Sequence, residues 1–235
     1  MQRRRGGFTL VEMMIVVAIV GTLAAVAVPS LLSSQRAAHE RKAASSLRMI
    51  ATAEQDFRAN DRDGNRTFDY WTGDVAGLYG MTSAAVPGRT DPPLRLLDVS
   101  IAAADSAPLA AGAAGGEYRA IGDFSVQGPS AGYWFYALQR DLTASPVQAY
   151  RTDTQGTPSM GSVQNSRCFA FLAYPDQYKS SGRTVLAINE TGSMIRRDPG
   201  RSIKARTTVP PGVPVSGNRD WPSFPTQKAQ WGRAE

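Results

Sequence analysis

The stretch Arg3-Arg4-Arg5-Gly6-Gly7-Phe8-Thr9-Leu10-Val11-Glu12 leads into an apolar run from Met13 to Val28, and it decides the fold of the N-terminal part of this chain. Between Phe8 and Val28 the only charged residue is Glu12. A run of this length can cross a bilayer as one helix. A carboxylate within such a helix costs about 2.5–3.5 kcal/mol at the helix centre. The presence of Glu12 therefore predicts a positively charged partner.

This segment resembles the prepilin signal shared by type IV pilins and type II secretion pseudopilins. The basic leader, Gly7, Phe8, Glu12 and Pro29 carry the resemblance. It implies that a membrane-bound prepilin peptidase cleaves after Gly7 and that Phe8, the new N-terminus, is N-methylated. It also implies assembly through Glu12, which would meet the N-terminal amine of a neighbouring subunit, with Pro29 relaxing the helix beyond it.

Two alternatives to the prepilin interpretation remain open. An ordinary secretory signal peptide ends at a small-residue cleavage site, and residues 24–27 offer one. In this chain, however, the Gly-Gly-Phe junction precedes the apolar core. A plain single-pass anchor is the second alternative, but it leaves Glu12 unexplained. The positive-inside rule keeps Arg3 to Arg5 in the cytoplasm. With the resemblance, this predicts a single-pass protein of the bacterial inner membrane whose head lies in the periplasm before it joins a pilus or pseudopilus.

The fold class predicted for the chain is α+β and pilin-like. A long N-terminal helix, with a transmembrane half and an amphipathic half, is expected to pack on a C-terminal antiparallel β-sheet head. The amphipathic half carries a small apolar face that includes Ile50 and Phe57. The expected segments are a leader at 1–7, a transmembrane helix half at 8–29, an amphipathic half at 30–59, a globular head at 60–198 and a proline-rich tail at 199–235 packed on the head, anchored by Trp221 and Trp231.

Apolar runs in the second half of the chain predict four strands of the sheet. They span residues 133–138, 168–174, 184–188 and 193–196, and Glu190-Thr191-Gly192 marks a turn between the last two. Residues 67–79 predict short strands or a packed loop.

Composition limits the choice of partners and of reactive side chains. The formal charge of +6 falls to +3 once the three leader arginines are removed, which does not favour nucleic acid as a partner. Cys168 is the only cysteine, so the chain has no intramolecular disulfide. Its apolar neighbours predict a buried thiol. The only histidine, His39, is expected to be a solvated residue of the helix.

Asp61, Asp63, Asn65 and Asp69 form the best metal candidate, because oxygen ligands at alternate positions resemble the start of a Ca²⁺ loop. The pattern departs from that loop at Arg66, where glycine is expected. The same residues favour a turn without any metal.

A Gly-x-Ser-x-Gly pattern at residues 128–132 resembles a hydrolase motif. That motif needs a helix after the serine and a histidine to activate it, whereas a strand is predicted to follow here and His39 lies on the stalk. We therefore expect a loop at this position and no enzymatic activity.

The sequence thus predicts a structural subunit of a type IV pilus or of a type II secretion pseudopilus. Its expected partners are the peptidase, copies of itself or other pilin-like subunits, an inner-membrane assembly platform and membrane lipid. A minor or tip pilin that binds DNA or a surface is the alternative. Basic residues of the head would serve that role, namely Arg196, Arg197, Arg201, Lys204 and Arg206.

Overall fold

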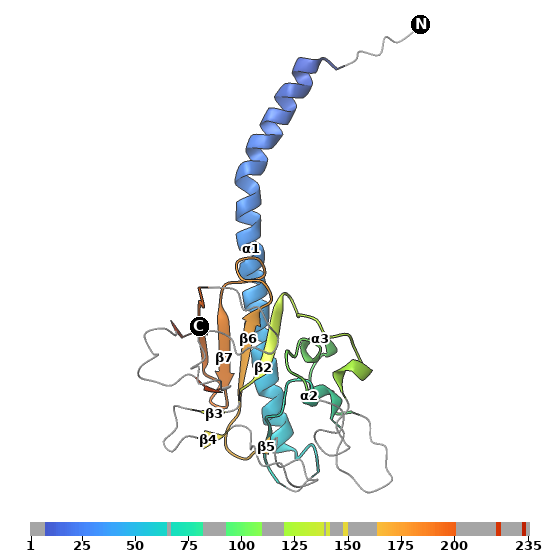
Figure 1. Cartoon of the computed structure of the whole chain (residues 1–235), viewed down its shortest axis with the longest axis vertical. Coiled ribbons are helices and arrows are strands. Elements are labelled where there is room, and N and C mark those ends of the chain that lie inside the picture. Colours follow the sequence, from blue (N-terminus) through green and yellow to red (C-terminus); the bar gives the residue numbers. More distant parts are fainter. Residues whose placement is uncertain are drawn as a thin grey trace.

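The computed structural model shows a long helical stalk that enters a globular head (Figure 1). It describes residues 8–64, 67–81, 93–109, 120–138, 140–141, 148–149, 164–200, 220–221 and 232–233. The leader with Gly7, the calcium candidate Asn65 and most of the tail from residue 201 onward lie outside the described residues.

Helix α1 runs from Leu10 to Ala59. Thr9 caps its start, because the Thr9 hydroxyl accepts the Glu12 N–H at 3.2 Å and the Glu12 carboxylate accepts the Thr9 N–H at 2.9 Å. This reciprocal pair satisfies two amide groups that have no partner in a first helical turn. The helix continues through Pro29, and Figure 1 shows it curving along its apolar part. Proline removes one backbone hydrogen bond, which accounts for a bend without a break.

The second half of α1 packs lengthwise against the head. Its buried side chains recur every three or four residues, as one face of a helix requires. They are Ala43, Ser46, Leu47, Ile50, Ala53, Glu54 and Phe57. The predicted partners Ile50 and Phe57 do share this face, and both are fully buried.

The main sheet has five antiparallel strands in the order β10-β8-β7-β6-β2. The strands are β2 (Tyr133–Ala137), β6 (Ala170–Pro175), β7 (Val185–Asn189), β8 (Met194–Arg197) and β10 (Gly232–Arg233). The first four coincide with the four segments predicted as strands, so the α+β class is confirmed. Strands β6, β7 and β8 follow one another in the sequence and are also neighbours in the sheet, as hairpin connections produce.

Both faces of this sheet are buried. Phe135 and Phe171 point into the core that α1 completes with Leu47 and Ile50. The alternate residues, among them Trp134, form a second apolar cluster on the other face. The continuous apolar character of β2 and β6 follows from this double burial, because successive side chains of a strand point to opposite faces.

Short elements complete the head. Strand β1 (Tyr70–Trp71) pairs with β5 (Gln164–Asn165), so residues 67–79 do contain a short strand. The short helices are α2 (Gly77–Gly80), α3 (Val99–Ala102) and the 3-10 turn η1 (Ile121–Asp123).

Two short segments of the tail pair with the head. Strand β3 (Arg140–Asp141) lies between β4 (Gln148–Ala149) and β9 (Asp220–Trp221), and β10 lines the edge of the main sheet beside β8. The predicted anchoring by Trp221 and Trp231 falls outside what the structure describes, since Trp231 and the side chain of Trp221 are not placed.

Candidate functional site

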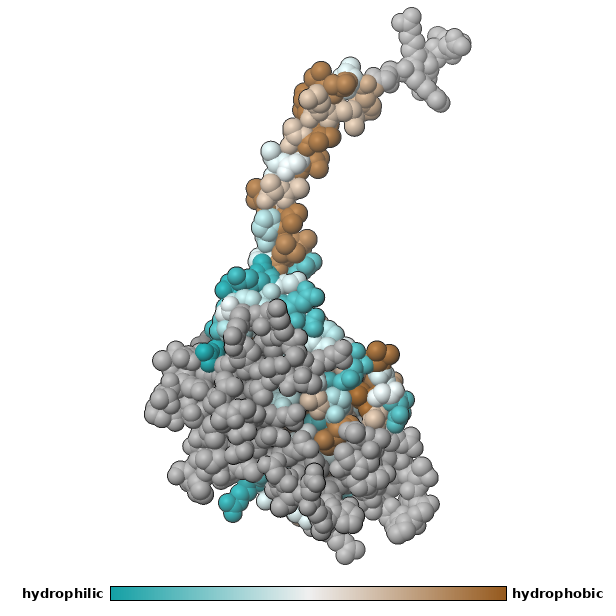
Figure 2. All heavy atoms as spheres, in the orientation of Figure 1, coloured by the Kyte–Doolittle hydropathy of each residue, from teal (hydrophilic) through white to brown (hydrophobic). Residues whose placement is uncertain are grey.

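The apolar N-terminal half of α1 stands free of the head. Side chains from Phe8 to Leu32 are exposed, with Phe8 at 81 % and Val26 at 77 % of their full accessible surface. Figure 2 shows this stretch as a band of hydrophobic side chains that ends where the stalk meets hydrophilic residues at the head. An exposed apolar surface of this size marks a membrane or protein interface.

The stalk has the length and composition of a membrane span. Its helix α1 is the one helix of the described chain that is long and apolar enough to cross a bilayer. The 20 residues from Met13 to Leu32 carry no charge. At a rise of about 1.5 Å per residue they extend about 30 Å, which matches the hydrocarbon thickness of a bilayer.

Hydroxyl groups in the span and just after it donate hydrogen bonds to backbone carbonyls of the helix. The Thr22 hydroxyl donates to the Ile19 carbonyl at 2.8 Å, and the Ser33 and Ser34 hydroxyls donate to the Ser30 carbonyl at 2.8 and 3.0 Å. Hydroxyl groups bonded in this way can face lipid or a neighbouring helix without an unsatisfied donor. The hydroxyl groups therefore do not argue against membrane insertion.

Glu12 lies at the exposed tip of the stalk, one helical turn after Phe8. Its Oε2 accepts hydrogen bonds from the Thr9 N–H and the Thr9 hydroxyl, both at 2.9 Å. A carboxylate has about four acceptor positions, so two bonds to one oxygen leave capacity for a further donor. The capping box thus holds the carboxylate beside the N-terminus while it remains open to a cation from outside the chain.

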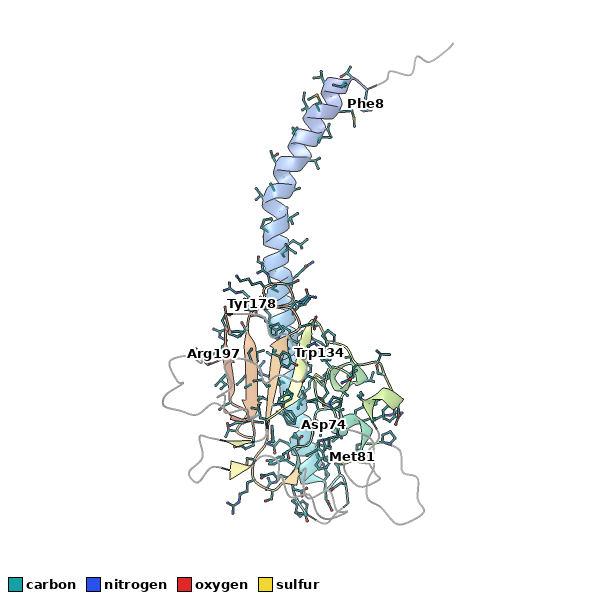
Figure 3. All side chains as sticks on the ribbon, viewed as in Figure 1. Phe8, Asp74, Met81, Trp134, Tyr178 and Arg197 are labelled. Atoms are coloured by element: carbon teal, nitrogen blue, oxygen red, sulfur yellow. The ribbon has the colours of Figure 1, made fainter. Side chains whose placement is uncertain are left out.

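Phe8 lies at the start of the described stalk (Figure 3), and Glu12 follows it in the first turn of α1, so the assembly role of these two residues stays a prediction. The cleavage position Gly7 lies outside the described residues, so processing there stays a prediction. Pro29 lies inside the exposed part of α1, about 17 residues along the helix from Glu12.

A buried carboxylate of α1, which sequence analysis did not single out, connects the helix to the head. Glu54 is fully buried, and its Oε2 accepts the Trp71 N–H at 2.9 Å. Burial, together with the nearby carboxylates of Asp69 and Asp74, raises the pKa of Glu54 well above its usual value. The available signal was its position, because Glu54 interrupts the apolar stripe between Ile50 and Phe57.

Two buried aspartates organise the chain that follows β1. Asp74 accepts the indole N–H of Trp71 at 3.0 Å and the backbone N–H of Gly77 at 2.7 Å. Asp105 accepts the backbone N–H groups of Val75 at 2.6 Å and Ala76 at 2.9 Å. Burial and the neighbouring Asp74 raise the pKa of Asp105 to about 7. The two carboxylates thus accept backbone N–H groups that a regular helix or strand would otherwise satisfy.

Of the predicted calcium residues, Asp61 and Asp63 lie in the turn that follows α1, and Asp69 lies just before β1. Asp63 and Asp69 are buried, and Asp61 adopts a left-handed backbone with φ of 44°. Within the described residues, no group of three or more histidine, cysteine or acidic side chains is arranged to hold a metal ion. Asn65, the remaining ligand of the candidate, is outside the described residues, so calcium binding stays a prediction.

The expectation that His39 is solvated is wrong. His39 is half-buried, and its Nδ1 lies 3.0 Å from the Ser181 carbonyl oxygen of the β6–β7 loop. The His39 side chain faces the head because the β6–β7 loop lies beside α1 at that level. Residues 128–132 form a turn that leads into β2, as predicted, with Gly132 in the left-handed region at φ of 74°.

Cys168 is a buried thiol, as its apolar neighbours predicted. Of the basic residues considered for a binding surface, Arg196 is exposed and Arg197 half-buried, both at the end of β8. Arg201, Lys204 and Arg206 lie outside the described residues, so that surface also stays a prediction.

The N-terminal segment, which carries the exposed apolar helix, is similar to known proteins. Residues 2–28 match the family model of the prokaryotic N-terminal methylation motif. The chain is 44 % identical over 54 residues to the type IV major pilin protein PilA of Myxococcus xanthus, covering 23 % of this chain and 24 % of that protein. The motif and the relatives together support a pilin or pseudopilin family.

Two further relatives are the type II secretion system core protein G of Dickeya chrysanthemi and that of Aeromonas hydrophila. The first is 45 % identical over 47 residues, covering 20 % of this chain and 31 % of the relative. The second is 40 % identical over 52 residues, covering 22 % and 36 %. The matched segment thus spans about a quarter to a third of these relatives' length. No solved structure matches the chain significantly.

Proposed function

We propose that this protein is a non-enzymatic structural subunit of a type IV pilus or of a type II secretion pseudopilus. The observation that carries the proposal is the exposed apolar helix with Glu12 held at its tip beside Phe8. Such a helix cannot remain in water, because burying its surface contributes about 25 cal/mol for every Å² of apolar area. It needs first a membrane and then the helices of neighbouring subunits.

Processing prepares the assembly contact. A prepilin peptidase would cut the chain between Gly7 and Phe8, and the methylated amine of Phe8 would then carry one positive charge. In an apolar filament core, two unpaired charges are far less stable than one ion pair. The Phe8 amine of one subunit and the Glu12 carboxylate of another would therefore set the register between them.

The location and partners follow from this mechanism. The precursor crosses the inner membrane once, with the head in the periplasm, as the positive-inside rule predicts for Arg3 to Arg5. Copies of this chain or other pilin-like subunits would pack against its stalk, and an inner-membrane platform would supply the movement that extracts it from lipid.

Replacement of Glu12 tests the proposal. We expect Glu12→Ala protein to be processed to the same mature mass while filament yield falls by at least about tenfold, since breaking a buried ion pair costs about 3–5 kcal/mol. The matched control is Asp123→Ala, which removes an exposed carboxylate of the head. Processed Glu12→Ala protein that forms filaments as abundantly as the parent and the control, counted by electron microscopy, would refute the assembly role.

A further inference from the structure

The β6–β7 loop forms a rigid tip at the end of the head that faces the stalk. Figure 3 shows Tyr178, at this tip, beside the point where α1 leaves the head. Two hydrogen bonds join the loop to α1. Ser181 O lies 3.0 Å from His39 Nδ1, and the Arg183 N–H donates to Glu40 Oε1 at 3.0 Å. The loop is thereby fixed at the level of residues 39 and 40 of the helix.

Internal packing holds the shape of this loop. The Tyr133 ring occupies the space that a Cβ of Gly182 would need, and the Tyr133 hydroxyl donates to the Thr184 carbonyl at 2.9 Å. Lys179 adopts a left-handed backbone with φ of 67°, a conformation that a non-glycine residue rarely takes. Observed strain of this kind persists where the surrounding structure holds it, and the Lys179 residue is exposed.

Basic side chains of α1 and of the β6–β7 loop lie at this level, and we call four of them, Arg36, Arg41, Lys179 and Arg183, the basic collar. Arg183 forms an ion pair with Asp198 at 3.0 Å. Among the described residues, the other three make no ion pair. Figure 2 shows hydrophilic side chains gathered on the visible face where the apolar stalk meets the head.

Acidic groups near the collar are already engaged. Glu40 accepts the Arg183 N–H, and Asp176 accepts the indole N–H of Trp134 at 2.7 Å. Asp198 accepts hydrogen bonds from Arg183 and from the Tyr178 hydroxyl. These hydrogen bonds leave Glu40 and Asp176 charged. No carboxylate of the described residues forms an ion pair with Arg36, Arg41 or Lys179, so these three side chains can contact an anionic headgroup.

The collar lies within side-chain reach of the lipid headgroups. If Met13 to Leu32 fill the hydrocarbon core, residue 39 lies about 10 Å beyond its edge, just outside the polar layer. Arg36 is closer, and its Nε donates to the Leu32 carbonyl at 3.1 Å. Its guanidinium thus folds back toward the boundary, as arginines at membrane surfaces do. Tyr178 adds an aromatic side chain of the kind that is enriched at this interface.

We propose that the basic collar docks the head onto anionic phospholipid headgroups of the membrane that the stalk spans. This inference rests on the membrane-anchored state of the proposed function. Docking would fix the orientation of the head around the stalk before assembly, and extraction of the subunit would have to break the lipid contacts.

Hydrogen exchange of the full mature chain in lipid nanodiscs tests this docking. In discs of 30 % phosphatidylglycerol in phosphatidylcholine, the 176–184 peptide should exchange about fivefold more slowly than in pure phosphatidylcholine, as the attraction of one basic side chain to an anionic surface predicts. High salt should abolish the difference, because salt screens surface charge.

Lys179→Gln and Arg41→Gln should each reduce the protection, while Arg167→Gln is the matched control. Arg167 is exposed beside the start of β6, at the end of the head remote from the collar. Unchanged exchange in strands β6 and β7 would show that the variants fold.

Three outcomes would overturn the docking proposal. They are equal exchange in both lipids, protection that survives Lys179→Gln and Arg41→Gln together, and protection that grows with protein concentration in either lipid, which would indicate contact between subunits. Failure of the chain to enter either nanodisc would instead refute the membrane anchor of the proposed function, and the docking with it.

Discussion

Glu54 and Trp71 join the stalk to the head through one buried hydrogen bond, in which Glu54 Oε2 accepts the Trp71 N–H at 2.9 Å. Both residues are completely buried. The bond fixes the position of β1 along α1, and the Trp71 indole continues the connection to Asp74. Any force on the stalk of an assembled subunit would reach the head partly through this link.

Replacement of Glu54 by alanine should destabilise the head. The change leaves the Trp71 N–H without its acceptor and creates a cavity, and together these cost about 2–4 kcal/mol. Urea unfolding of the detergent-solubilised chain, followed by the fluorescence of buried Trp71 and Trp134, measures the effect. Thr52→Ala, at an exposed position of the same helix, should change the free energy of unfolding by less than about 0.5 kcal/mol. Equal stability of the two variants would contradict the role assigned to Glu54.

Replacement of Gly77 by alanine should also destabilise the head, for a steric reason. A Cβ at this position would collide with the Trp71 indole, whose N–H is bonded to Asp74. Forcing the ring aside costs about 1–3 kcal/mol or more. Gly122→Ala is the matched control, since no atom lies within 4 Å of its added Cβ. A thermal midpoint for Gly77→Ala as high as that for Gly122→Ala would show that the ring is not tightly held.

Stability of the head should fall as the pH rises from about 5 to 8. Glu54 and Asp105 have raised pKa values in the folded chain, Asp105 at about 7, because burial and neighbouring carboxylates disfavour their charged forms. A folded carboxyl with a raised pKa binds its proton more tightly than the unfolded one does. Its stabilising contribution is thus complete below the unfolded pKa and is lost as the pH passes the folded pKa.

The expected loss between pH 5 and 8 is on the order of 2 kcal/mol, measured by urea unfolding at each pH. Asp105→Asn should be less stable at every pH, because its amide cannot accept all the N–H groups that Asp105 accepts, but its pH dependence should be flatter. A parent chain whose stability rises over this range would contradict the protonated state inferred for these carboxyl groups.

The sequence predicts those parts of the fold that follow from periodic burial. The long helix and the four strands of the main sheet could be read because their apolar residues repeat with the spacing of a buried face. Asp74 and Asp105 could not be read, because their partners are backbone amides brought near only by the folded loop. The prediction that His39 is solvated was wrong for a similar reason, since its partner Ser181 lies 142 residues away in the chain.

The intact mass of the protein from its native membrane, combined with N-terminal sequencing, tests the central claim most directly. The account predicts a mature chain that begins at N-methylated Phe8, leaving Glu12 as its fifth residue. A chain that begins at Met1, or after Ala25 or Ala27, would contradict prepilin processing and with it assembly through the Phe8 amine and Glu12.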